Sequence, residues 1–228
     1  MKEPLAKVGS NIVWKDGQVL LFRAGMTIDA DGAPTAYHPD DTGLDWLENA
    51  GKPGNWWAVV TDNGDPDGTP VLQDEREPAP GFFISTTALQ DRNRDWADPR
   101  RYVDATSVPY IVLPGQVPNA RLGDFAAVIR PSTGALAYAI FADIGPPAHL
   151  GEGSIALAER LGVNPDARHG GTSEPLLYLV FSGSGDGRPH NAGEITREAE
   201  IRFRQWGGVA RARTCFEPSA EGFATGRP

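Results

Sequence analysis

Two carboxylates, Asp143 and Glu152, lie nine positions apart on either side of a loop rich in glycine and proline. Asp143 ends an apolar run that is typical of a β-strand, and Glu152 comes just before a run with helical spacing. Two carboxyl groups held on rigid elements can act as general acid and general base if their surroundings separate their pKa values. The same two residues also suit a strand end and a negative charge near a helix N-terminus. Spacing alone leaves both interpretations open.

The elements around this pair are predicted to be mostly short strands. The 27 glycines and 20 prolines are spread without a period, which indicates many turns between short elements. Strands are expected at residues 11–14, 18–28, 55–62, 81–89, 110–113, 124–129, 135–142 and 176–181. Asp16-Gly17 predicts a hairpin turn between the first two. We therefore expect a mainly β fold.

Helices are expected to be few. The clearest covers 154–161, with Ser154 as N-cap and Gly162 as the stop. One helical turn is expected near 44–47, and residues 194–207 suit either a helix or a strand. Neither an internal repeat nor a linker interrupts the chain, so we expect one domain over 1–228, with flexible ends at 1–10 and 216–228.

Composition excludes several classes of function. A formal net charge of −9 disfavours a nucleic-acid surface. No apolar run reaches the roughly 18 residues that a membrane span needs, and the first residues lack the apolar core of a signal peptide. The protein is therefore expected either in the cytoplasm or, if exported, by a route without a leader in this chain. Cys215 is alone and the four histidines are scattered, so we expect no disulfide, no metal and no cofactor.

Three segments, in this order, resemble glycoside hydrolase family 75, the chitosanases first known from fungi. They are FADIGP at 141–146, GEGSIALA at 151–158 and LLYLVFSGS at 176–184. The nine-position step from Asp143 to Glu152 also matches the family. The resemblance covers about residues 100–184 and is weaker from 25 to 100. The chain departs from the fungal enzymes in lacking their leader and cysteines, and in having Pro-Pro and His149 within the 143–152 loop.

The resemblance implies an endo-acting chitosanase that hydrolyses β-1,4 bonds between glucosamine units with inversion. It implies a six-stranded barrel of the double-psi type, with Asp143 and Glu152 as the catalytic pair. An inverting enzyme separates its two carboxyl groups by about 6.5–9.5 Å to admit a water. A nearby helix N-terminus favours Glu152 as the base, which leaves Asp143 as the acid. Cleavage of peptidoglycan glycan strands and a non-catalytic carbohydrate-binding module are the alternatives.

The substrate would be a cationic polysaccharide, bound by a monomer without nucleic-acid or membrane partners. Chitosan carries protonated amines, which carboxylates attract, and aromatic rings stack on sugars. The candidate substrate-binding residues are Asp29, Asp31, Tyr37, His38, Asp45, Trp56 and His149. Trp56 and Trp57 alternate along a predicted strand, so at most one of them faces a sugar. The acidic segment also suits a solvated turn, each tryptophan suits the core, and His149 suits an exposed loop.

Overall fold

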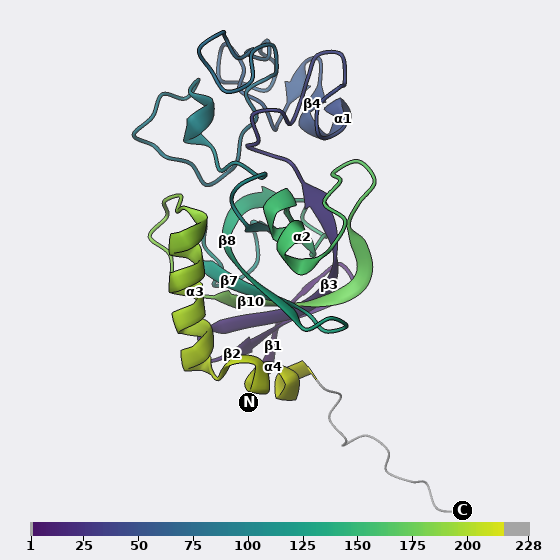
Figure 1. Cartoon of the computed structure of the whole chain (residues 1–228), viewed down its shortest axis with the longest axis vertical. Helices are drawn as coiled ribbons and strands as arrows, with labels where there is room; N and C mark the ends of the chain where they lie inside the picture. The colour runs from purple at the N-terminus through teal and green to yellow at the C-terminus, as the bar shows by residue number, and fades with distance from the viewer. Residues whose placement is uncertain (1, 217–228) are drawn as a thin grey trace, which may run out of the picture.

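The computed structural model describes residues 2–216, and its centre is a closed barrel of six strands (Figure 1). In barrel order the strands are β3 (Val19–Asp29), β10 (Thr172–Phe181), β7 (Phe125–Arg130), β8 (Ala135–Gly145), β6 (Tyr110–Pro114) and β9 (Glu152–Ser154). The barrel closes where β9 pairs with β3. The β3–β9 and β6–β8 pairs are parallel and the others antiparallel. The predicted six-stranded barrel is confirmed.

A hairpin extends the sheet beyond β3. It consists of β1 (Glu3–Val8) and β2 (Asn11–Asp16), and Gly17 turns the chain into β3 with φ +62°. The predicted hairpin at Asp16-Gly17 is therefore confirmed. Residues 3–8, which we expected in a flexible end, pair with β2 along the whole of β1. Of the expected flexible end at 216–228, all but Phe216 lies outside the described residues.

Four α-helices make the fold a mixed α/β structure, which corrects the mainly β expectation. They are α1 (Leu47–Ala50), α2 (Ile155–Leu161), α3 (Ala192–Trp206) and α4 (Gly208–Phe216), and a 3₁₀ turn covers Pro99–Arg101. The predicted helix is α2: Ser154 Oγ accepts from Leu157 N, and Gly162 ends the helix with φ 63°. None of the helices in the described part of the chain is long and apolar enough to span a membrane.

The ambiguous segment at 194–207 is the long helix α3. Asn191 and Glu194 form a capping box at its start, which two strand residues could not make. Ile195, Ala199 and Phe203 repeat every fourth residue and bury one stripe against the outer face of β7 and β8. The spacing of four positions between these apolar residues is the pattern of a helix. The charged residues between them made this pattern hard to recognise in the sequence.

Residues 30–105 form loops over one end of the barrel (Figure 1). Their only strands are the two-residue β4 (Gly51–Lys52) and β5 (Asn55–Trp56). Of the strand predicted at 55–62 only residues 55–56 form, and the strand predicted at 81–89 is wrong. Single bridges such as Val59–Ser85 replace continuous ladders there. The apolar residues of these segments are buried in the core between the loops and the barrel. Their burial therefore does not require that the segments pair as strands.

The barrel strands are buried on both faces. One core cluster collects alternate residues of β3, β6, β7, β8 and β10, together with α2. The other combines the opposite faces of these strands with α3 and the loops of 30–105. Val112 of β6 belongs to this second cluster. The face that carries Val112 is therefore the outer one, where the loops meet the barrel.

Candidate active site

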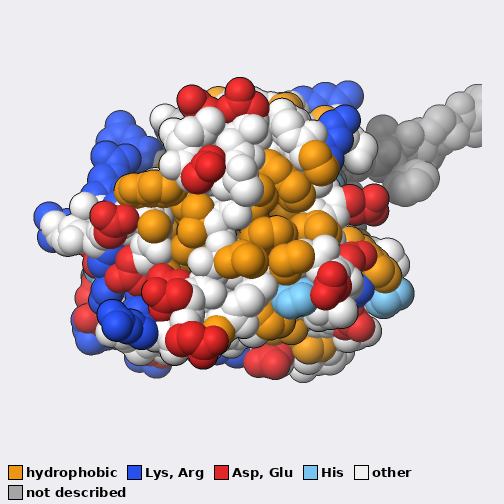
Figure 2. Space-filling view, turned by 90° about the horizontal axis from the view of Figure 1, so that it is seen from above, with side chains coloured by type: hydrophobic (Ala, Val, Ile, Leu, Met, Phe, Trp, Pro, Cys, Tyr) orange, Lys and Arg blue, Asp and Glu red, His pale blue; other side chains and the backbone are white. Residues whose placement is uncertain are grey.

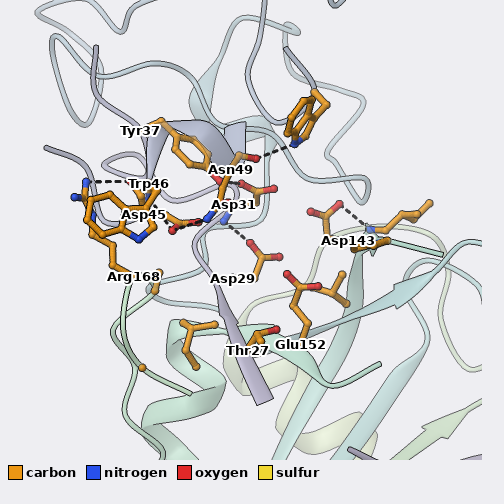
Figure 3. A pocket seen from close by; sticks show the side chains of 18 of the residues that line it. Thr27, Asp29, Asp31, Tyr37, Asp45, Trp46, Asn49, Asp143, Glu152 and Arg168 are labelled. Atoms are coloured by element: carbon orange, nitrogen blue, oxygen red, sulfur yellow. Dashed lines mark hydrogen bonds between the residues drawn. The ribbon is translucent and has the colours of Figure 1, made fainter. Parts of the chain in front are cut away.

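Strand β6 places Asp143 and Glu152 on either side of one residue. Val112 pairs with Asp143 across the parallel β6–β8 ladder and with Glu152 across the antiparallel β6–β9 ladder. Directly paired residues point to the same face of a sheet. Because neighbouring strands are about 4.8 Å apart, the two Cα atoms lie about 10 Å from each other. The two carboxyl groups face a common space beside Asp29 (Figure 3).

A β-bulge in β8 turns Asp143 into this space. The register moves from Ile111–Phe141 to Val112–Asp143, which leaves Ala142 as an extra residue. The carbonyl of Ala142 accepts from Leu89 N at 2.8 Å. Asp143 Oδ1 accepts from the backbone amides of Ala88 at 2.8 Å and Ile144 at 2.9 Å. The 88–89 loop therefore fixes both the bulge and the carboxylate.

Glu152 lies in strand β9, and its carboxyl group accepts no hydrogen bond from residues 2–216. Glu152 pairs with Thr27 of β3. It lies two positions before Ser154, the N-cap of α2. A Cβ added at Gly145 would lie 2.9 Å from Val112 Cγ1 and 3.0 Å from Glu152 Oε2. Glycine at 145 therefore leaves the room that the Glu152 carboxyl occupies. The backbone amide of Leu157, from which a capping Glu would accept a hydrogen bond, already donates to Ser154 Oγ.

The pair opens into a cavity of about 620 Å³ between the barrel and the loops. Its walls come from β3, β6, β8 and β9 and from segments within 31–57 and 167–170. Five carboxylates line it: Asp29, Asp31, Asp45, Asp143 and Glu152. Seen from the loop end, the surface has a central band of hydrophobic side chains with both acidic and basic ones around it (Figure 2). The five carboxylates of the cavity itself would attract a cationic ligand.

Asp29, Asp31 and Asp143 form a compact cluster, with one carboxylate oxygen of each within 4.8 Å of the others. Among residues 2–216 this is the only group of three His, Cys, Asp or Glu side chains with that spacing. Such carboxylates either share protons or hold a cation. Several of the oxygens already accept hydrogen bonds: Asp29 Oδ1 from Asp31 N at 2.7 Å, and Asp31 Oδ1 from the Tyr37 hydroxyl at 2.6 Å. These hydrogen bonds fix the carboxyl groups of Asp29 and Asp31 in position within the cluster.

Burial prevents the carboxyl groups of the cavity from ionising together. Burial raises the pKa of Asp29 to about 6 and that of Asp31 well above its ordinary value, where the Asp29 charge adds to the effect. Burial, followed by the charge of Asp29, raises the pKa values of Asp143 and Glu152 to about 8 each. A cluster of this kind retains protons at neutral pH, which an acid catalyst requires.

Hydrogen bonds distinguish the two members of the pair. The amides of Ala88 and Ile144 and a hydrogen bond from Asp31 lower the pKa of Asp143 against the effect of burial. The pKa of Glu152 has only burial and the neighbouring charges of Asp29, Asp143 and Asp45 acting on it, and all of them raise it. Both pKa values are nevertheless raised to about 8, so the difference between the two groups lies in their contacts: Asp143 accepts hydrogen bonds that stabilise its anion, and Glu152 accepts none among residues 2–216.

The other predicted substrate-binding residues divide into two groups. Asp29, Asp31, Tyr37 and Asp45 line the cavity. His38, which packs against Phe82, and His149, whose Nε2 lies 3.2 Å from Thr27 Oγ1, are not among the lining residues. Trp56 is buried against Phe83 in the core, and its neighbour Trp57 lines the cavity.

Sequence reasoning missed the cavity wall formed by residues 167–170. Arg168 stacks on Trp46 at 4.1 Å and donates to the carbonyls of Asp41 at 2.8 Å and Asp45 at 3.1 Å. It joins parts of the chain that are more than 120 positions apart, for which the local sequence carries no signal. Thr27 and Asn49, which also line the cavity, were missed as well. Asn49 Nδ2 donates to both oxygens of Asp45 at 2.9 Å.

Replacement of Glu152 by Gln is expected to stabilise the protein at alkaline pH. A group whose pKa rises on folding binds its proton more tightly in the folded state, so stability is lost as pH rises from about 4 towards 8. A neutral Gln removes this loss. Thermal unfolding should show the Tm of the variant above wild type at pH 8, by about 2–4 °C for each kcal/mol gained, and unchanged at pH 4.

The exposed Glu159 on α2 supplies the matched control for this measurement. Glu159→Gln should leave the difference in Tm between pH 4 and pH 8 as it is in wild type. An equal Tm for wild type and Glu152→Gln at pH 8 would contradict the burial of an ionisable Glu152.

Comparison with known families gives one match, and it covers most of the barrel. The profile described as fungal chitosanase of glycosyl hydrolase group 75 matches residues 65–206. The matched segment contains Asp143, Glu152 and Arg168 but begins after the acidic segment and Trp57. No curated protein matches the chain. The resemblance read from the three sequence segments is confirmed.

Proposed function

Because the chain belongs to glycosyl hydrolase group 75, the fungal chitosanase family, and is a glycoside hydrolase, we propose that it cleaves chitosan with Asp143 and Glu152 as an inverting pair. The observation that supports this most is the double pairing of Val112, which holds the two carboxylates on one face across a single strand. Strand spacing puts their Cα atoms about 10 Å apart. Side chains that lean towards each other from there reach the separation of about 6.5–9.5 Å that inversion needs.

The hydrogen bonds that Asp143 accepts and Glu152 lacks support Asp143 as the base and Glu152 as the acid. Protonated Glu152 gives its proton to the glycosidic oxygen as the C1–O bond breaks, and the leaving sugar departs as an alcohol. Ionised Asp143 takes a proton from a water that attacks C1 from the opposite side. The new reducing end is therefore the α-anomer. At the end of the cycle Asp143 holds the proton and Glu152 is ionised, and exchange with solvent restores the starting state.

The charge of the cavity supports a glucosamine polymer as the substrate. Five carboxylates line the cavity, and Arg168, the one Lys or Arg among the lining residues, is already bound to Asp41, Asp45 and Trp46. Protonated amines of chitosan would be attracted and would in turn favour ionisation of the nearest carboxylates. Acetylated units lack this charge and would bind less well.

Three further features follow from the proposal. A polysaccharide substrate lies outside the cell, so the protein would act after export. The family resemblance implies the double-psi connection of the six barrel strands. One chain would be sufficient for the reaction, because the cavity is lined by both carboxylates of a single copy.

The proposed function is tested by two digestions in which the formation of new reducing ends is measured. The purified protein is incubated with chitosan and, separately, with purified peptidoglycan. The proposal predicts release of oligosaccharides from chitosan. Release from peptidoglycan alone would contradict it in favour of the glycan-strand alternative, and absence of release from both would favour a binding module.

Trp57 is expected to bind a sugar ring of the substrate. Its side chain lines the cavity with 58% of its surface exposed, and its indole Nε1 donates to Asn49 O at 2.8 Å, which fixes the plane of the ring. Loss of a stacking contact of about 1 kcal/mol corresponds to a roughly fivefold weaker binding. Trp57→Ala should raise KM on chitosan about 5- to 10-fold with kcat changed less than twofold.

Two further variants make this prediction specific. Trp57→Phe keeps an aromatic face and should recover most of the affinity. Trp96 is also exposed, at 42%, but does not line the cavity, so Trp96→Ala should keep the wild-type KM. Equal effects of the two alanine variants would show that Trp57 does not stack on substrate.

A further inference from the structure

Asp31 is held more firmly than a residue that only attracts a cationic polymer would need. Its backbone amide donates to Asp29 Oδ1 at 2.7 Å, and its carbonyl accepts from the Tyr110 hydroxyl at 3.0 Å. Its Oδ1 accepts from the Tyr37 hydroxyl at 2.6 Å, with Ser85 Oγ at 3.5 Å. Both tyrosine side chains are almost wholly buried. The carboxyl group is therefore fixed in position by the fold.

Every ionisable group that faces Asp31 is acidic or a tyrosine. Asp29 comes from β3, Asp143 from β8 and Glu152 from β9, while Tyr37 comes from the loops and Tyr110 from β6. The cavity cation Arg168 is engaged by Asp41 and Asp45. No positive charge among the described residues compensates Asp31, and burial together with the Asp29 and Asp143 charges keeps its pKa well above the ordinary value.

Two carboxylates, Asp29 and Asp143, lie in the 4.8 Å cluster with Asp31, and the side-chain hydrogen bond from Asp31 goes to Asp143. Oδ1 of Asp31 is occupied by the Tyr37 hydroxyl, so a proton on Asp31 resides on Oδ2. The carboxylate of Asp143 lies within the 4.8 Å cluster, and its Oδ1 is occupied by the amides of Ala88 and Ile144. A proton on Asp31 can therefore be shared with Asp143 without displacing any other hydrogen bond.

We propose that Asp31 is a positioning residue for the hydrolysis: it remains a neutral acid and donates a hydrogen bond to the Asp143 carboxylate, which orients that base and keeps it ionised. The inference rests on the proposed function, because it gives Asp143 the role of the base. It also changes the role expected for Asp31, from a negative charge that binds substrate to a hydrogen-bond donor.

Two substitutions at Asp31 separate these roles. Asn is neutral and can still donate to Asp143, as the protonated acid does, whereas Ala cannot donate. If Asp31 acts as a donor, Asp31→Asn keeps kcat/KM on chitosan within about threefold of wild type. Asp31→Ala loses the hydrogen bond to a charged group, so the pKa of Asp143 rises and the acid limb of the pH–rate profile moves up by about 1–2 pH units.

The experiment is a set of pH profiles of kcat/KM on chitosan for wild type, Asp31→Asn, Asp31→Ala and Asp40→Asn. Asp40 is an exposed carboxylate of the same acidic segment that does not line the cavity, so its variant should reproduce the wild-type profile. Equal damage from Asn and Ala at position 31, or an acid limb that stays in place in Asp31→Ala, would overturn the inference. Wild-type inactivity on chitosan would instead overturn the proposed function.

A second measurement does not depend on activity or on the folding of the alanine variant. Carbon-13 NMR of protein labelled at the aspartate carboxyl groups should show a protonated aspartate at neutral pH that disappears in Asp31→Asn. Absence of that signal from wild type would overturn the inference. Incubation with EDTA should leave activity unchanged, since the cluster holds protons; a loss that a divalent cation restores would also overturn it.

Discussion

Replacing Glu152 by Gln is expected to lower kcat on chitosan by about 10³-fold, within the range that a general acid contributes. Gln has nearly the same shape but cannot give a proton to the leaving oxygen. The Glu152 carboxyl has no hydrogen-bond donor among residues 2–216, so the replacement breaks no contact of the fold. Initial rates on chitosan, compared with circular dichroism of the same sample, measure the effect.

The control for Glu152 is a substrate that does not need an acid. A glycoside whose leaving group is already a weak base departs without a proton, so Glu152→Gln should hydrolyse it within about tenfold of the wild-type rate. If the variant loses both activities equally, Glu152 does not act as the acid.

Replacing Asp143 by Asn is expected to cost about 10³-fold on both kinds of substrate, because the attacking water needs its base whatever the leaving group is. Asn can still accept from Ala88 N and Ile144 N through its side-chain oxygen, so the bulge of β8 should survive. Steady-state rates on chitosan and on the activated glycoside measure the loss.

A small external nucleophile provides a second test of Asp143 as the base. Asp143→Ala leaves space beside the water, and azide, which needs no base, should restore turnover of the activated glycoside and give the α-glycosyl azide. The opposite pattern, with Asp143→Asn active on the activated substrate and Glu152→Gln not, would exchange the two roles. It would restore the order that the helix N-terminus suggested.

Several barrel strands could be predicted from sequence because they are buried on both faces, whereas the six-stranded barrel itself was implied by the family resemblance. LLYLVF at 176–181 and YIVLPG at 110–115 are continuous apolar runs between turn residues, and both form barrel strands. The loops of 30–105 could not be predicted, because their apolar residues look like strand residues but pack singly under turns. Period and composition do not distinguish the two cases.

Asp143 and Glu152 could be predicted as a catalytic pair only through the family resemblance. The geometry that brings them together could not be predicted from the sequence. In the sequence, only the Gly- and Pro-rich loop between Asp143 and Glu152 could set their spacing. In the structure β6 sets it, through Val112 and an extra residue at Ala142, which are long-range pairings that no local pattern encodes. The proposed assignment of acid and base differs from the expected one for the same reason, since Ala88 and Asp31 are distant in sequence from Asp143.

The central claim is that Asp143 and Glu152, one strand apart on either side of Val112, hydrolyse a β-glycosidic bond by a single displacement. The most direct measurement is proton NMR of the first reducing ends that wild type releases from chitosan, recorded before the anomers equilibrate. The account predicts that the α-anomer appears first and the β-anomer later by mutarotation. A β-anomer at the earliest times would mean retention, which needs carboxyl groups about 5 Å apart, and would contradict the account.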